Sequence, residues 1–123
     1  IIMNALRNKV QLIGNLGMNP ELRKLDSGSS VAKFTMATNE SYVNKKGERV
    51  DDTQWHNVVA WGKTAELMGE LLAKGKEVMV EGKLTSRSWD DKEGNKRYIT
   101  EVVASEFLLM TRDAKKQEGD LPF

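Results

Sequence analysis

The chain has 123 residues, of which 39% are hydrophobic and 30% are charged, and its formal net charge is +1. This length and balance are typical of one soluble globular domain. Cysteine is absent, which excludes disulfides, thiolate zinc sites and cysteine nucleophiles. No apolar run approaches the roughly 20 residues that a membrane span requires, and no signal peptide is recognisable, so we expect a cytoplasmic protein.

Alternating apolar and polar residues predict β-strands through the first half of the chain. The strand candidates cover residues 9–16, 21–25, 31–43 and 53–61. Residues typical of turns separate them, at Asn19-Pro20, 26–29 and 44–48. This half of the chain is therefore predicted to contain strands and turns.

One helix is predicted after the strand at 53–61. Thr64 is its expected N-cap, while Lys74 is expected in the last turn and Gly75 at the C′ position. An apolar stripe at helical spacing consists of Leu67, Met68, Leu71 and Leu72.

Alternation returns over residues 76–89, and a polar loop at 90–96 connects this strand to a second arm at 97–104. Five main strands with one helix between the third and the fourth match the order of an OB-fold barrel. We therefore expect a mainly β OB-fold domain over residues 3–110, followed by a flexible tail over residues 111–123.

Two tryptophans share one face of the strand at 53–61. Trp55 and Trp61 lie six residues apart, and residues an even number apart on a strand point the same way. The opposite parity holds His56, Val58 and Ala60. Because these smaller residues suit a core or an interface, the tryptophans are predicted to lie on a surface.

One parity of the strand at 76–89 repeats this arrangement. It holds Lys83, Thr85, Arg87 and Trp89. Cations there suit the phosphates of a single strand, and flat rings suit its unpaired bases. A fourth candidate ring is that of Tyr42, and the flanking candidate cations are Lys33, Lys63 and Arg97. A lone tryptophan is more often part of a core, so the pattern alone leaves both core packing and nucleic-acid binding open.

Several longer stretches resemble the bacterial single-stranded DNA-binding protein family. They are NKVQLIGNLG (8–17), VAKFTMATNES (31–41), TQWHNVVAWGKTAEL (53–67), LLAKGKEVMVEGKL (71–84), SRSWDDKEGNKRYITEVVA (86–104) and DLPF (120–123). The resemblance covers residues 4 to about 110 and the last few residues, and the combination of these stretches is specific.

The resemblance implies an OB-fold homotetramer around which single-stranded DNA wraps, without preference for sequence and without a cofactor or metal. It implies replication, recombination and repair as the setting, and a cytoplasmic, nucleoid-associated location. The implied stacking residues are Tyr42, Trp55, Trp61 and Trp89. The implied phosphate contacts are Lys9, Lys63, Lys74 and Arg87, to which position adds Lys33, Lys83 and Arg97.

The resemblance also assigns two further regions and exposes two departures. It places His56, the only histidine, at a subunit interface. It implies that the tip formed by Asp120, Leu121, Pro122 and Phe123 docks on replication and repair proteins, although the linker before it is short. Asn57 and Thr85 stand where the family often has Arg, which makes the predicted face less cationic.

Three alternative functions remain open at this point. An OB-fold is also compatible with RNA binding or with a primosomal accessory protein. A purely structural oligomer is a second alternative. An enzyme is a third, but the acid pairs Asp51-Asp52 and Asp90-Asp91 are expected in loops, and neighbouring residues do not converge as metal-dependent nuclease chemistry requires. We therefore predict a binding protein and not an enzyme.

Overall fold

The computed structural model describes residues 4–110, and the predicted tail at 111–123 lies outside the described residues. The elements in chain order are α1 (Asn4–Arg7), β1 (Val10–Leu16), β2 (Glu21–Lys24), β3 (Ser30–Val43), β4 (Arg49–Trp61), α2 (Gly62–Leu71), β5 (Glu77–Asp90) and β6 (Lys96–Leu109). Within residues 4–110, neither helix is long and apolar enough to cross a membrane.

Five of the strands close into a barrel. The strand order is β1-β5-β6-β4-β3-β2, and an additional pairing between β1 and β3 joins the two sides. The β4–β6 pairing is parallel, with Val58 opposite Val102, and the other pairings are antiparallel. Because α2 connects the third barrel strand to the fourth, the topology is that of an OB-fold, and the predicted fold class is confirmed.

Two glycines allow the barrel to bend where its strands change partners. Around Gly14, β1 leaves β5 and begins to pair with β3, and a Cβ at this position would overlap the carbonyl of Ala37. Gly82 follows a register shift between β5 and β6, and a Cβ there would overlap the carbonyl of Val103. Glycine is required at both positions because another backbone approaches too closely for a side chain.

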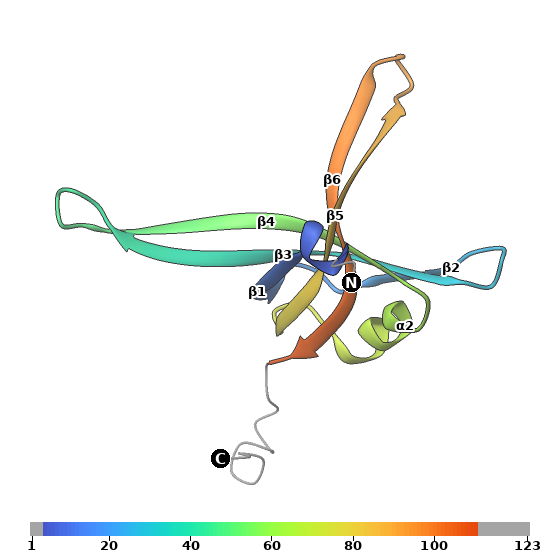
Figure 1. Ribbon diagram of the computed structural model, residues 1–123, viewed down its shortest axis with the longest axis horizontal. Helices are drawn as coiled ribbons and strands as arrows, with labels where there is room; N and C mark the ends of the chain where they lie inside the picture. Colours follow the sequence, from blue (N-terminus) through green and yellow to red (C-terminus); the bar gives the residue numbers. More distant parts are fainter. Residues whose placement is uncertain (1–3, 111–123) are drawn as a thin grey trace, which may run out of the picture.

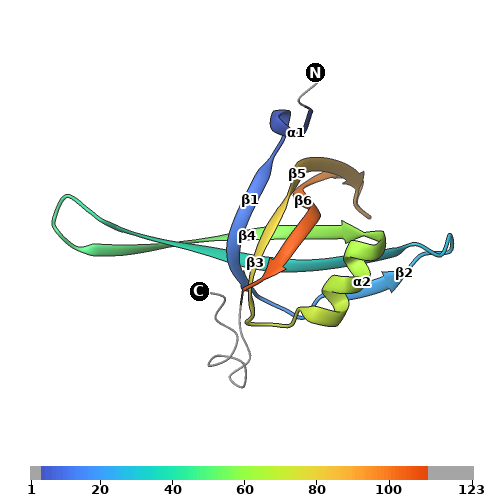
Figure 2. The same cartoon turned by 60° about the horizontal axis from the view of Figure 1, so that its bottom comes forward.

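The core fills the inside of the barrel and is covered at one end by α2 (Figure 2). Strand alternation directs one parity of β3 and β4 inward, including Phe34, Met36 and Val58. From α2, Ala65 and Met68 are buried against these strands. The two long hairpins β3–β4 and β5–β6 extend beyond the barrel in different directions (Figure 1).

The strands are longer than the alternation predicts. β4 begins at Arg49, so Asp51 and Asp52 lie in a strand, and β5 extends to Asp90. The prediction that both acid pairs lie in loops is therefore wrong for Asp51, Asp52 and Asp90, and holds only for Asp91. Pairing along the hairpin outweighs the low strand propensity of the acids, and the Asp51 carboxylate accepts a 2.7 Å hydrogen bond from Ser41. β6 similarly continues to Leu109 by pairing with β5.

The ends of α2 also differ from the prediction. The helix begins directly after Trp61, whose extended backbone forms the N-cap without a side-chain hydrogen bond, so the prediction of Thr64 as the N-cap is wrong. The helix ends at Leu71, and the N–H of Leu72 donates to the carbonyl of Met68. Gly75, with φ 89°, is therefore beyond the C′ position and forms the turn that leads into β5.

Candidate nucleic-acid interface

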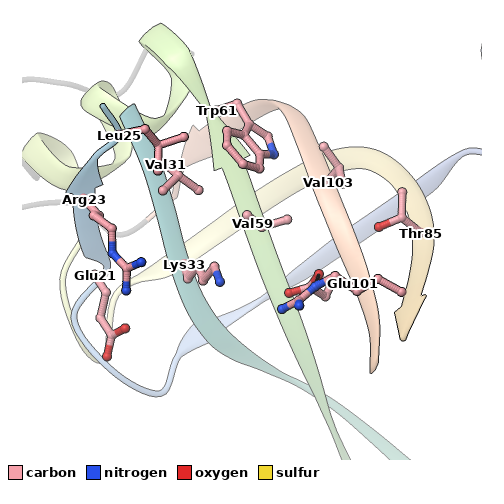
Figure 3. A pocket seen from close by; sticks show the side chains of 11 residues that line it. Glu21, Arg23, Leu25, Val31, Lys33, Val59, Trp61, Thr85, Glu101 and Val103 are labelled. Carbon is pink, nitrogen blue, oxygen red and sulfur yellow. Dashed lines mark hydrogen bonds and ion pairs between the residues drawn. The ribbon is translucent and has the colours of Figure 1, made fainter. Parts of the chain in front are cut away.

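A groove of about 410 Å³ crosses the outer face of five neighbouring strands (Figure 3). Its lining residues come from β2, the segment after it, β3, β4, β6 and β5. They are Glu21, Arg23, Leu25, Val31, Lys33, Val59, Trp61, Thr85, Arg87, Glu101 and Val103. Segments far apart in the sequence therefore build one continuous surface.

The floor of the groove is apolar and one end carries an aromatic ring. Val31 and Val59 are buried beneath it, and Trp61 lies directly opposite Val31 in the β3–β4 pairing. Half of the Trp61 side chain surface remains open, with 51% exposure. In Figure 3, Lys33 projects from the neighbouring strand on the same side of the sheet as Val59 and Trp61. A flat ring and a cation thus border one apolar hollow.

A second hollow of about 260 Å³ continues the groove toward Trp55. It shares Glu21, Lys33, Arg87 and Glu101 with the first hollow and adds Thr35 and Asn57. Trp55 lies two residues before Asn57 on the same face of β4, and it pairs with Ala37 of β3. Its indole lies over Gly17, yet the residue is 62% exposed.

Trp89 lies two residues beyond the groove residue Arg87, near the end of β5, and does not itself line the groove. It is 43% exposed, and the guanidinium carbon of Arg87 lies 5.4 Å from the centroid of its ring. The Nε of Arg87 donates to the carboxylate of Glu101 at 2.9 Å. This hydrogen bond, followed by the attraction of the opposite charges, raises the pKa of Arg87. The structure therefore joins a ring, a cation and a buried acid in one contact series.

The predicted cations do not all lie in this groove. Lys33 and Arg87 line it, whereas Lys9 and Lys83 line a separate hollow beside β1 and β5. Lys9 forms an ion pair with Glu81 at 3.6 Å, and Arg97 forms one with Asp91 at 2.9 Å. The remaining two predicted cations are exposed near the two ends of α2, at Lys63 and Lys74.

Tyr42 and His56 lie apart from the three tryptophans. Tyr42 is exposed on the projecting β3–β4 hairpin, opposite Val50, and strand alternation turns it to the other face of the ribbon from Trp55. His56 is partly buried, and its Nε2 forms a 2.9 Å hydrogen bond with the hydroxyl of Thr38. Of the aromatic residues predicted to stack, only Trp61 lines the groove, while Trp55 and Trp89 lie beside it on β4 and β5.

The groove contains charged residues that the sequence pattern did not single out. Arg23 adds a cation from β2, and Glu21 and Glu101 add two acids. Glu101 is only 7% exposed, in a strand segment that otherwise reads as apolar. The β5–β6 pairing places Glu101 opposite Thr85, on the face that carries Arg87. Strand alternation combined with this pairing register is therefore the signal that could have identified Glu101 from the sequence. The groove is therefore mixed in charge and not uniformly basic.

An OB-fold barrel that carries exposed rings and cations along an open groove belongs to a class of domains that bind oligonucleotides. The model of the single-strand binding protein family matches residues 7–110. The chain belongs to this family, whose members are DNA-binding proteins and not enzymes, in agreement with the prediction of a non-enzymatic protein.

Two curated relatives are named single-stranded DNA-binding protein 1. The one from Chlorobaculum tepidum is 47% identical over 104 residues, which cover 84% of this chain and 64% of the relative. The one from Xylella fastidiosa is 45% identical over 117 residues, which cover 94% of this chain and 84% of the relative. The chain thus spans less than two thirds of the length of the first relative.

Solved structures of similar fold include two of single-stranded DNA-binding proteins. One is a Plasmodium falciparum SSB complex with ssDNA, with a TM-score of 0.79, 32% identity, and coverage of 85% of this chain and 95% of that chain. The other is a deletion mutant of the single-stranded DNA binding protein from Thermus aquaticus, with a TM-score of 0.74, 31% identity, and coverage of 85% and 50%.

Proposed function

We propose that this protein binds and protects single-stranded DNA without preference for sequence. The observation that carries the proposal is that three tryptophans remain exposed at or beside the groove. Trp61 lines it and is 51% exposed, while Trp55 and Trp89 lie on β4 and β5 outside its lining and are 62% and 43% exposed. Exposing three indoles to water is unfavourable unless a ligand covers them. Unpaired bases have flat faces that stack on such rings whatever the base, which makes the binding independent of sequence.

The phosphates of the same strand are proposed to contact the cations around these rings. Lys33 and Arg87 lie within the groove, and the others are Lys9, Lys63, Lys74, Lys83 and Arg97. Each contact releases counterions from the DNA, so affinity falls as salt rises. Tyr42 is proposed as a further stacking ring. The DNA strand reaches this ring only if it continues onto the β3–β4 hairpin.

A titration followed by tryptophan fluorescence tests the proposal. Oligo-dT is expected to quench the fluorescence and to bind more tightly than duplex DNA or structured RNA, with affinity that falls with salt. Trp55→Ala and Trp89→Ala are each expected to weaken binding by about 1–3 kcal/mol without loss of the fold. Tyr98→Ala is the matched control, because Tyr98 is an exposed aromatic residue that alternation turns away from Glu101 and the groove. Equal affinity for duplex DNA would overturn the proposal.

We further propose that the protein acts as a homotetramer. An apolar row crosses the outer face of β1, β5 and β6, where Ile13 pairs with Met79 and Met79 with Leu108. Ile13 and Leu108 are exposed in the single chain, and an exposed apolar row of this kind favours association. His56 is proposed to lie at a subunit contact. Native mass spectrometry with and without oligo-dT measures both the subunit number and the number of strands bound, and a monomer would contradict this proposal.

The cellular role is proposed to be protection of single strands during replication, recombination and repair, in the cytoplasm and at the nucleoid. The tip at 120–123 is proposed to bind partner proteins through the Phe123 ring. A peptide of sequence EGDLPF is expected to bind such a partner and to lose binding when Phe123 is removed. Binding that is unchanged by this removal would exclude the tip.

A further inference from the structure

The buried acid of the groove contacts the cation nearest to a stacking ring. Glu101 is 7% exposed, whereas the Arg87 side chain is 53% exposed. The Nε of Arg87 donates to the Oε1 of Glu101 at 2.9 Å, and the same guanidinium lies 5.4 Å from the centre of the Trp89 ring. One carboxylate therefore holds a cation that also contacts a ring.

The geometry of this contact leaves part of the guanidinium available. Arginine has five N–H donors in a planar fork, and the ion pair with Glu101 uses the Nε edge. Hydrogen bonds shown among residues 4–110 leave the Nη1 and Nη2 edge of Arg87 without a partner. This edge is the one that can bind a phosphate in bidentate fashion.

The surroundings of Glu101 restrict its movement. It lies opposite Thr85 in the β5–β6 pairing, and the residues two positions away on the same face of β6, Ile99 and Val103, are both partly buried. An exposed arginine loses side-chain entropy when it binds a ligand, and a contact that orders it beforehand reduces this loss. A buried carboxylate on a rigid strand is suited to provide this order.

We propose that Glu101 is a positioning residue for DNA binding: it orients Arg87 over Trp89 so that the Nη edge of the guanidinium meets the phosphate of the base that stacks on the ring. This inference rests on the proposed function. Glu101 contributes through Arg87 and makes no contact with the strand itself. The negative charge of Glu101 therefore favours binding of a polyanion, although an acid in a groove would ordinarily repel one.

A double-mutant cycle on oligo-dT affinity tests this proposal. Arg87→Gln and Glu101→Gln are each expected to weaken binding by about tenfold or more, the lower end of the scale for one charge-assisted hydrogen bond. The double variant is expected to bind no more weakly than Arg87→Gln alone, because Glu101 has nothing left to orient. Glu101→Asp keeps the charge but shortens the side chain, so it is also expected to weaken binding.

The controls separate positioning from repulsion, from folding and from failure of the proposed function. Glu70→Gln removes one negative charge from the exposed face of α2 and is expected to leave binding unchanged, while melting temperatures show whether each variant folds. Tighter binding by Glu101→Gln would show that the acid only repels DNA. Effects of Arg87→Gln and Glu101→Gln that multiply in the double variant would show that Glu101 acts independently, and either result overturns the inference. If the wild-type protein does not bind oligo-dT, the proposed function itself fails.

Discussion

The indole of Trp55 lies over Gly17, so closely that a Cβ at Gly17 would come within 2.5 Å of the Trp55 ring atom Cζ3. The N–H of Gly17 donates to the carbonyl of Thr35 at 2.8 Å, which ties this backbone to β3. The Thr35 hydroxyl lies on the same side, 3.0 Å from the Cβ position. The absent side chain of Gly17 thus leaves the space in which the ring lies.

The first prediction concerns this contact. Gly17→Ala is expected to displace the exposed Trp55 ring and to weaken oligo-dT binding by about 1 kcal/mol, the lower end of the value for one stacked base. Stability should change little, because the ring is free to move into solvent. Fluorescence titration and a melting curve measure the two effects. An unchanged affinity would show that the position of Trp55 over Gly17 does not matter for binding.

The second prediction concerns the barrel closure. Gly14→Ala is expected to destabilise the fold by about 1–3 kcal/mol, toward the upper end, because the added Cβ meets the backbone carbonyl of Ala37. Gly69→Ala is the matched control in α2: its Cβ would meet only the exposed Leu22 side chain, and Ala gains about 1 kcal/mol over Gly in a helix. Urea unfolding of both variants tests this contrast, which fails if Gly14→Ala is as stable as the wild-type protein.

The third prediction concerns charge in the groove. Asn57→Arg adds a cation to the hollow between Lys33 and Trp55, and it is expected to tighten binding at low salt. The salt dependence, as the slope of log affinity against log salt, should steepen by about 0.7 for the added phosphate contact. Gln54→Arg adds the same charge on the opposite face of β4 and should leave the slope nearly unchanged. Equal slopes for the two variants would argue against a phosphate path past Asn57.

The fourth prediction concerns the turn between β5 and β6. Hydrogen bonds from the backbone of Asn95 first, and from Arg97 and Glu93, lower the pKa of Asp91 from its ordinary value of 3.8. Because the folded pKa is the lower one, this contribution to stability is fully present above the ordinary pKa and is lost as pH falls through the folded pKa. The turn is therefore expected to stay intact down to the ordinary pKa of 3.8 and to lose this contribution only below it.

An NMR titration of the Asp91 carboxyl carbon measures this pKa directly, and Asp91→Asn should abolish the acid transition at this turn. The same titration reports on the ion pair with Arg97. A midpoint at or above the ordinary 3.8 would contradict the hydrogen bonds to the turn backbone.

Period-two alternation predicted much of this site from the sequence. It placed Trp55 and Trp61 on one face of a strand, and the structure shows both exposed there. It also placed Arg87 and Trp89 together, and they are in contact. These relations are local, because they depend only on neighbouring residues in one strand.

Contacts between residues on different strands could not be predicted from the alternation. Glu101 lies 14 residues after Arg87, and only the β5–β6 register brings the two together. Val59 has the parity of the tryptophans but is buried, because it lies on the floor of the groove between Lys33 of β3 and Val103 of β6. The alternation likewise could not predict where Tyr42 lies relative to the groove, since this depends on how far the β3–β4 hairpin extends.

The groove has walls from β2, β3, β4, β5 and β6, and these strands adjoin one another only in the closed barrel. The unfolded chain therefore offers no equivalent site, and a bound strand stabilises the folded state alone. At free DNA one hundred times the dissociation constant, this linkage adds about 2.7 kcal/mol to the free energy of unfolding. Protein with a strand bound in the groove is therefore expected to resist heat and proteolysis better than the empty protein.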